Sequence, residues 1–206
     1  MDPMCFDCTD HTTGSLEPLT RCRGLQDLSV TAADLPRLIG QLPESLWRLN
    51  VRGPEVTELS WPGWCRDDGL SVSLQGVAAD TISYLADLGR TVELLEIYDC
   101  PDLTAGSLEP LTRCPVLYSL TLPGGVPDAG SLEPLTRLVK SCQELGTLCL
   151  HCTTDTGRAV LTALKEADLQ YSNGWPRTIY LRVPEELYRQ LKSQEGDGVW
   201  VGPWDY

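Results

Sequence analysis

Apolar residues recur along the chain in the pattern L-x-x-L-x-L, in which the first, fourth and sixth positions carry leucine or, in variant copies, another residue. Alternation over the last positions of this pattern is typical of a short β-strand with one buried face. Strands are therefore predicted at 25–30, 46–51, 56–61, 92–97, 117–122, 145–150 and 178–183, and a further one at 70–74.

A repeated octapeptide precedes three of these strands. The sequence Gly-Ser-Leu-Glu-Pro-Leu-Thr-Arg occurs at 14–21, 106–113 and 130–137. Its serine lies ten residues before the first strand leucine in two copies and fourteen residues before it in the third. Because the difference is close to one helical turn, we expect a helix between octapeptide and strand. The predicted N-caps are Ser15, Ser107 and Ser131, with glutamate and proline in the first turn.

Each unit is therefore expected to be one short helix followed by one short strand, repeated along the chain. Self-similarity of this kind predicts a solenoid. The spacing between strand starts is least regular at 52–91, where a helix at 79–88 is expected behind the strand at 70–74. The segment 184–192 is predicted to be an amphipathic helix. The apolar, aromatic residues 199–206 are expected to cap the last coil, with a partner-binding tail as the alternative.

Cysteines extend the leucine pattern between 92 and 122. Cys100 follows one strand, and Cys114 stands three residues before Leu117, as Cys22 and Cys142 do before their strands. This stretch resembles the cysteine-containing leucine-rich repeats known from the substrate-binding parts of F-box proteins. The resemblance implies an α/β horseshoe with parallel concave strands and convex helices. No F-box helix bundle is recognisable ahead of the repeats, so a ubiquitin-ligase role would need a separate chain.

The expected organisation is a single leucine-rich repeat domain over 1–206. Within it, 1–24 would form the N-terminal cap and first helix, and 184–206 the C-terminal cap. The part between them, 25–183, would hold about six to seven repeats, irregular at 52–91.

The charge balance limits the class of partner. The chain carries 29 acidic and 16 basic residues, a formal net charge of −13. Nucleic acid and anionic membranes are therefore not expected as partners, because both require a basic surface. A protein with a basic or mixed surface is the expected partner, although net acidity is also common in soluble proteins.

The cysteines and the apolar runs indicate the compartment. Of nine cysteines, at least four are expected to pack as small apolar residues between coils, which favours a reducing intracellular location such as the cytoplasm. The first residues lack the basic and apolar regions of a signal peptide, and no apolar run approaches the roughly 18 residues of a membrane span.

Strand positions beside the middle leucine are expected to point outward on the concave face and to bind a protein partner. This makes the chain a non-catalytic interaction module or adaptor. The predicted contact residues are Trp47, Arg48, Asn50, Glu58, Ser60, Glu96, Tyr98, Tyr118 and Thr121. Aromatic members of this set would be anchors, or alternatively rim packing between coils.

Two clusters leave open an alternative function as a metal-dependent protein or enzyme. Cys5, Cys8 and His11 form one cluster, and Cys149, His151 and Cys152 form the other. Either set contains ligands that suit zinc. The chain has two histidines and no nucleophile-elbow, phosphate-loop or dinucleotide-binding motif, so we expect no catalysis and no cofactor.

Overall fold

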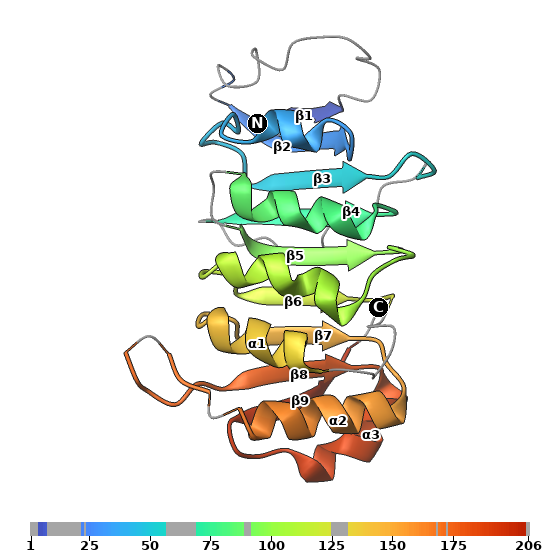
Figure 1. Cartoon of the computed structure of the whole chain (residues 1–206), viewed down its shortest axis with the longest axis vertical. Coiled ribbons are helices and arrows are strands. Elements are labelled where there is room, and N and C mark those ends of the chain that lie inside the picture. The colour runs from blue at the N-terminus through green and yellow to red at the C-terminus, as the bar shows by residue number, and fades with distance from the viewer. Residues whose placement is uncertain are drawn as a thin grey trace. The chain divides into compact units, whose positions relative to one another are not determined.

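The computed structural model describes residues 22, 24–56, 69–88, 92–124, 132–167, 169–171 and 173–204, together with the backbone of 4–7. The chain divides into two compact units, Met1–Asp102 and Leu103–Tyr206, hereafter unit 1 and unit 2. Each unit is α/β in class, with parallel strands on one side and helices on the other (Figure 1).

Among the described residues of unit 1, each strand pairs with the next described strand along the chain, and these pairs are parallel. Short 3₁₀ helices lie between some of these strands. The elements are β1 (Met4–Asp7), β2 (Leu25–Thr31), η2 (Leu35–Leu38), β3 (Arg48–Arg52), β4 (Leu70–Gln75), η3 (Ala79–Asp87) and β5 (Val92–Tyr98).

Unit 2 repeats this arrangement with longer helices, and its described strand pairs are again parallel. Its elements are η4 (Ala105–Arg113), β6 (Ser119–Leu122), α1 (Glu133–Ser141), β7 (Thr147–Leu150), α2 (Thr154–Lys165), β8 (Ile179–Val183), α3 (Glu185–Leu191), η5 (Lys192–Gln194) and β9 (Val199–Pro203). No helix among the described residues is both long and apolar enough to span a membrane.

The predicted strand leucines form the core of each unit. In unit 1, Leu28, Leu49 and Val72 are successive register partners, and all three are 0% exposed. In unit 2, Leu148 and Leu181 are partners in the same way and equally buried. Stacking similar residues on neighbouring strands buries one continuous apolar row per unit, which explains why the pattern recurs.

The second and third octapeptide copies contribute to helices η4 and α1, as predicted, but the N-caps of these helices are Thr104 and Leu132 rather than the octapeptide serines. The N-cap of η4 is Thr104, whose hydroxyl accepts from the backbone N–H of Ser107 at 3.2 Å. In return, the backbone N–H of Thr104 donates to the hydroxyl oxygen of Ser107 at 3.1 Å. The prediction of Ser107 as N-cap was therefore wrong, because Thr104 lies three residues upstream and starts the helix earlier. The N-cap of α1 is Leu132, which makes no side-chain cap hydrogen bond, so the prediction of Ser131 as N-cap was also wrong. Ser15 lies outside the described residues.

The spacing difference between octapeptide copies changes the type of helix. With ten residues between serine and strand leucine, the copy at 106–113 forms the 3₁₀ helix η4, which contains Pro110. With fourteen residues, the copy at 130–137 leads into the α-helix α1. The two copies also contact each other, because Arg137 of α1 lies 2.8 Å from Glu109 of η4. The octapeptides of these two neighbouring repeats therefore contact each other.

Several elements differ from the prediction. Val56 lies outside any strand, and the rest of the strand expected at 56–61 falls outside the described residues. Within the segment expected to cap the last coil, Val199–Pro203 form β9, which pairs with β8 in parallel register. A further segment folds back on itself before β8: Gln170 and Pro176 form an antiparallel bridge. This hairpin, 169–177, was not predicted.

Candidate partner-binding surface

The strand positions that face away from the leucine core form polar rows in unit 1. Ser29 is the register partner of Asn50, and Asn50 is the partner of Ser73. All three residues are 0% exposed. Neighbouring parallel strands lie about 4.8 Å apart, so short side chains in such a row shield one another. The expectation that Asn50 offers an accessible side chain to a partner was therefore wrong.

Trp47 and Arg48 form a packed cluster with an acidic neighbour. Arg48 Nη1 lies 3.1 Å from Oδ1 of Asp27, its register partner on β2. The Arg48 guanidinium also lies 5.5 Å from the centroid of the Trp47 ring. Asp27 is buried, while Trp47 and Arg48 are half-buried. The cluster therefore fixes the orientation of two predicted contact residues and leaves part of each accessible.

Glu96 and Tyr98 are joined directly on β5. The Tyr98 hydroxyl donates to Glu96 Oε2 at 3.0 Å, and both residues are half-buried. Burial raises the pKa of the Glu96 carboxyl, and the bond from Tyr98 opposes that rise. The pair is thus preorganised on the strand face. Two other predicted contact residues, Glu58 and Ser60, lie outside the described residues and stay predictions.

In unit 2, the predicted residues Tyr118 and Thr121 differ in accessibility. Thr121 is 8% exposed, and its register partner Cys149 is 6% exposed, so neither offers much surface. Tyr118 is 37% exposed. Its ring lies over Gly146, where an added Cβ would stand 3.3 Å from a ring carbon. Thr121 is therefore a poor contact residue, for the same reason as Asn50, whereas Tyr118 remains accessible.

The most accessible aromatic residues on the strand face are on β8 and β9. Tyr180 and Trp200 are register partners on these parallel strands. Tyr180 is 53% exposed and Trp200 is 55% exposed. Their neighbours Leu181 and Val201 point the other way and are buried. Alternation along the strands therefore produces an apolar underside and an aromatic outer face.

Arg182 extends this outer face along β8. It is two residues from Tyr180, on the same side of the strand, and it is exposed. We call Tyr180, Arg182 and Trp200 together the β8–β9 face. The sequence pattern indicated that Tyr180 and Arg182 point outward. It did not place Trp200 beside them, because β9 was expected to be a cap rather than a paired strand.

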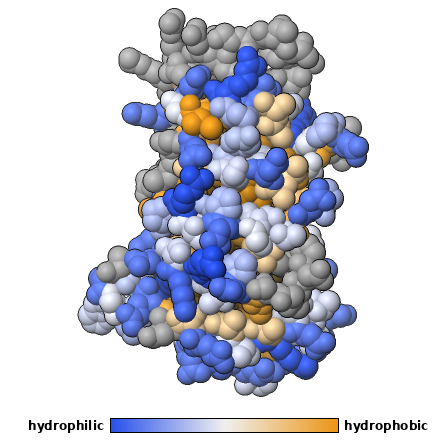
Figure 2. Space-filling view, in the orientation of Figure 1, coloured by the Kyte–Doolittle hydropathy of each residue, from blue (hydrophilic) through white to orange (hydrophobic). Residues whose placement is uncertain are grey.

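The helix-covered side presents a different surface. Figure 2 shows mostly hydrophilic side chains over the described helices, with small and separated hydrophobic areas. Ion pairs such as Arg137 with Glu133, at 2.8 Å, and Arg189 with Glu185, at 2.9 Å, lie on exposed helix positions. This side has the character of an ordinary solvated surface.

The cysteines predicted to pack between coils divide into buried and exposed members. Cys114 and Cys142 are buried, as predicted, and the Cys142 thiol donates to the Leu111 carbonyl oxygen at 3.3 Å. Burial raises the pKa of Cys142 to about 12. Cys100 is half-buried. Cys22 is exposed, so its predicted burial was wrong; it stands before β2, where the preceding helix was expected but is not described.

Neither proposed metal cluster gains support. Within the residues that the structure describes, no group of three or more histidine, cysteine, aspartate or glutamate side chains is placed to hold a metal ion. Cys149 is buried and Cys152 is half-buried, with burial raising the pKa of Cys152 to about 11. A thiol with a raised pKa is a poor nucleophile at neutral pH. Cys8, His11 and the side chain of Cys5 lie outside the described residues.

Comparison with known proteins does not identify a family: no protein-family model matches the chain, and no curated protein matches it at a significant level.

Proposed function

We propose that this chain is a non-catalytic leucine-rich repeat module that binds a protein partner through the β8–β9 face. The observation that carries the proposal is the pair of half-exposed aromatic residues, Tyr180 and Trp200, side by side on adjacent strands. Tyrosine, tryptophan and arginine are the residue types that contribute most to protein–protein binding, and this face contains one of each.

The repeat architecture supports the leucine-rich repeat assignment. Strands pair consecutively and in parallel within each unit, and similar leucines stack in register. The repeated octapeptide forms the helix side of its unit, which is the convex side in the proposed horseshoe. In such solenoids the strand face is the usual binding surface, and it suits an extended protein or peptide better than a buried small molecule.

Strand pairing gives the β8–β9 face a rigid base. Tyr180 and Trp200 lie on strands whose alternate residues are buried in the core of unit 2. Trp204 N–H donates to the Val183 carbonyl oxygen at 2.8 Å, which holds the end of β9 beside β8. Aromatic anchors on rigid strands lose little conformational entropy when they bind.

Each unit also contains accessible residues of the original set elsewhere on its own surface. Trp47, Arg48, Glu96 and Tyr98 in unit 1 are half-buried and held by mutual contacts, and Tyr118 in unit 2 is 37% exposed. They are secondary candidates, because preorganised but partly covered residues contribute less contact area than Tyr180 or Trp200.

The partner is a protein with a basic or mixed surface, and the chain acts in a reducing intracellular compartment such as the cytoplasm. The net charge of −13 supports a basic partner, since it speeds encounter at low salt. Within the described residues, the thiols of Cys100, Cys142 and Cys152 form no disulfide, which supports a reducing environment.

The test is quantitative affinity capture from the native cell with three versions of the chain. The double variant Tyr180→Ala/Trp200→Ala removes both aromatic residues, while Trp175→Ala removes a tryptophan that is 70% exposed on the hairpin instead. We expect proteins retained by the parent chain to be lost from the double variant and kept by the Trp175 control. Equal retention by all three versions would eliminate the β8–β9 face as the binding surface.

A further inference from the structure

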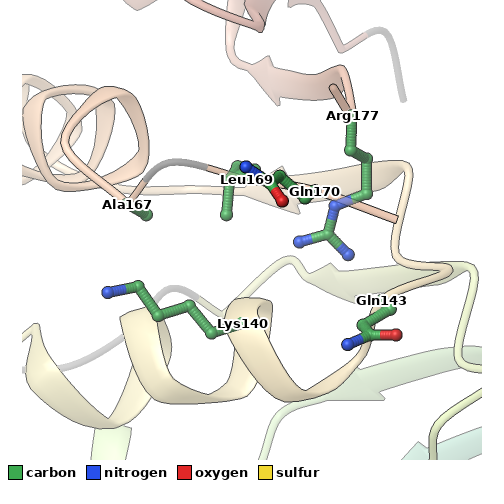
Figure 3. Close-up of a pocket in the computed structure, with 6 residues that line it drawn as sticks. All are labelled: Lys140, Gln143, Ala167, Leu169, Gln170 and Arg177. Atoms are coloured by element: carbon green, nitrogen blue, oxygen red, sulfur yellow. The ribbon is translucent and has the colours of Figure 1, made fainter. Parts of the chain in front are cut away.

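A cavity of about 440 Å³ opens within unit 2, between the end of α1 and the segment that leads into β8. Figure 3 shows α1 and the turn after it on one side of this hollow, and the hairpin 169–177 with the end of the α2 segment on the other. Its lining residues are Lys140, Gln143, Ala167, Leu169, Gln170 and Arg177.

Arg177 is the buried member of this set. It is 2% exposed, and its guanidinium donates through Nη2 to the Val139 carbonyl oxygen at 2.6 Å and through Nη1 to the carbonyl oxygen of Cys142. These are carbonyl groups at the end of α1, so the arginine closes the helix at its negative end. Its Nε is buried and has no hydrogen-bond partner. The contacts hold the guanidinium in place without using all of its donors.

The positive charge at the cavity is only partly balanced. A helix end carries about half a negative charge, which does not neutralise a full guanidinium charge. Burial lowers the pKa of Arg177, and the charges of Cys142, Tyr171 and Glu144 oppose this. Lys140 adds a second cation, and within the described part of the chain neither cation is paired with a carboxylate. The lining set itself contains no acidic residue.

The other lining groups define what fits beside this charge. Gln143 and Gln170 provide amide N–H donors, and Ala167 and Leu169 provide an apolar wall. A volume of about 440 Å³ is in the range of pockets that hold small organic molecules, and it exceeds what a single inorganic ion fills. The ligand that matches this lining has an anionic head and a small organic body.

We propose that the cavity between α1 and the hairpin binds a small organic anion, whose carboxylate or phosphate group contacts Lys140 and the amides of Gln143 and Gln170. Arg177 acts from its buried position, where its positive charge sets the local field. The apolar part of the ligand lies against Ala167 and Leu169. This site is separate from the β8–β9 face and does not depend on the proposed protein binding.

The experiment is a nuclear magnetic resonance titration of the full chain, with the side-chain amide signals of Gln143 and Gln170 as reporters. Glutarate and propyl phosphate serve as carboxylate and phosphate probes, with sodium chloride added to keep ionic strength constant. We expect saturable shifts of both amides with at least one probe, and the probe that saturates identifies the head group. Lys140→Gln should weaken that affinity at least about fivefold, because it removes a charge-assisted contact.

The matched control is Arg158→Gln, which removes an exposed cation on α2 outside the cavity and should leave the affinity unchanged. Arg177→Lys is a second variant, which keeps the positive charge but loses the planar guanidinium group. If this variant fails to fold, the result for Lys140→Gln still decides the outcome. Shifts that rise linearly with both probes, or equal affinity in the parent and Lys140→Gln, would overturn the proposal.

Discussion

Tyr180 on β8 and Trp200 on β9 are register partners on parallel strands, and each keeps more than half of its surface exposed. Large aromatic residues on a strand are normally covered, because burial of their apolar area stabilises the fold. Here the residues beside them in sequence, Leu181 and Val201, supply that burial. The exposed pair is therefore available for contact with another molecule.

Removing the aromatic pair should affect binding more than folding. We expect Tyr180→Ala/Trp200→Ala to change the free energy of unfolding by less than about 1 kcal/mol, because the side chains make few core contacts. Urea denaturation of the purified variant measures this. As a comparison, Leu181→Ala deletes a fully buried side chain on β8 and should cost about 3 kcal/mol. If the aromatic variant lost as much free energy of unfolding as Leu181→Ala does, the pair would serve to stabilise the fold rather than to bind a partner.

Gly53→Ala should destabilise unit 1. A Cβ added at Gly53 would lie 1.8 Å from the backbone oxygen of Gly76, which is far inside van der Waals contact. Gly53 also donates its N–H to the Gln75 carbonyl oxygen at 2.8 Å, so the loops cannot separate without losing that bond. We expect a loss of at least about 2 kcal/mol, measured by urea denaturation.

Gly106→Ala is the control for that change. Its added Cβ would come no closer than 3.7 Å to the Thr104 hydroxyl oxygen, which is ordinary contact. Because alanine also restricts the unfolded chain, this variant should be neutral or slightly stabilising. If both glycine variants were equally unstable, the close approach of Gly53 and Gly76 would not be the cause.

Arg177→Met should destabilise unit 2 because it removes a buried group that closes α1. The carbonyl oxygens of Val139 and Cys142 would lose their bonds to the guanidinium. We expect a loss of about 3 kcal/mol in the free energy of unfolding, as for other buried polar groups left without partners. Arg158→Met, on the exposed face of α2, should change it by less than about 0.5 kcal/mol. Equal values for the two arginines would contradict the capping role.

The free energy of unfolding should fall as the pH rises above about 9, because the Cys142 thiol ionises more readily in the unfolded chain. This thiol has an ordinary pKa of 9.0, raised in the fold to about 12 by burial. The unfolded chain therefore ionises this thiol first, and the folded state loses free energy relative to it as the pH rises from 9 toward 12. At pH 10.5 the loss is about 2 kcal/mol for this group.

The measurement compares urea denaturation at pH 8 and pH 10.5 for the parent, Cys142→Ala and Cys22→Ser. The alkaline loss should shrink in Cys142→Ala. It should be unchanged in Cys22→Ser, because Cys22 is exposed. If the free energy of unfolding depended on pH in the same way in Cys142→Ala and in the parent, the raised pKa assigned to Cys142 would be contradicted.

The strand prediction succeeded where leucines repeat at fixed spacing, because that spacing determines which residues can be buried together. The strands around Leu28, Leu49 and Leu120 lie where the pattern placed them. The helix α2 was missed, partly because Gly157 lies inside it and glycine is a weak helix former. An added Cβ at Gly157 would lie 2.9 Å from Leu187, so close packing of α2 on α3 explains the glycine. A sequence alone does not show that contact.

The contact residues were harder to predict than the strands. Alternation correctly separates Asn50 and Thr121 from the leucine core, but it does not reveal how much neighbouring strands cover them. Accessibility depends on side-chain length as well as direction, which is why Tyr180 is exposed and Ser29 is not. Trp200 became a candidate only once β9 was seen to pair with β8. Pairing of a terminal segment is a tertiary property.

The most direct test of the proposed binding surface is site-specific photocrosslinking in the native cell. A photoreactive phenylalanine analogue is placed at position 180, at position 200, or at the control position 175 on the exposed hairpin. Positions 180 and 200 should crosslink to the same protein, and position 175 should not. Absence of a crosslink at both strand positions, or the same product from position 175, would contradict the proposed binding surface.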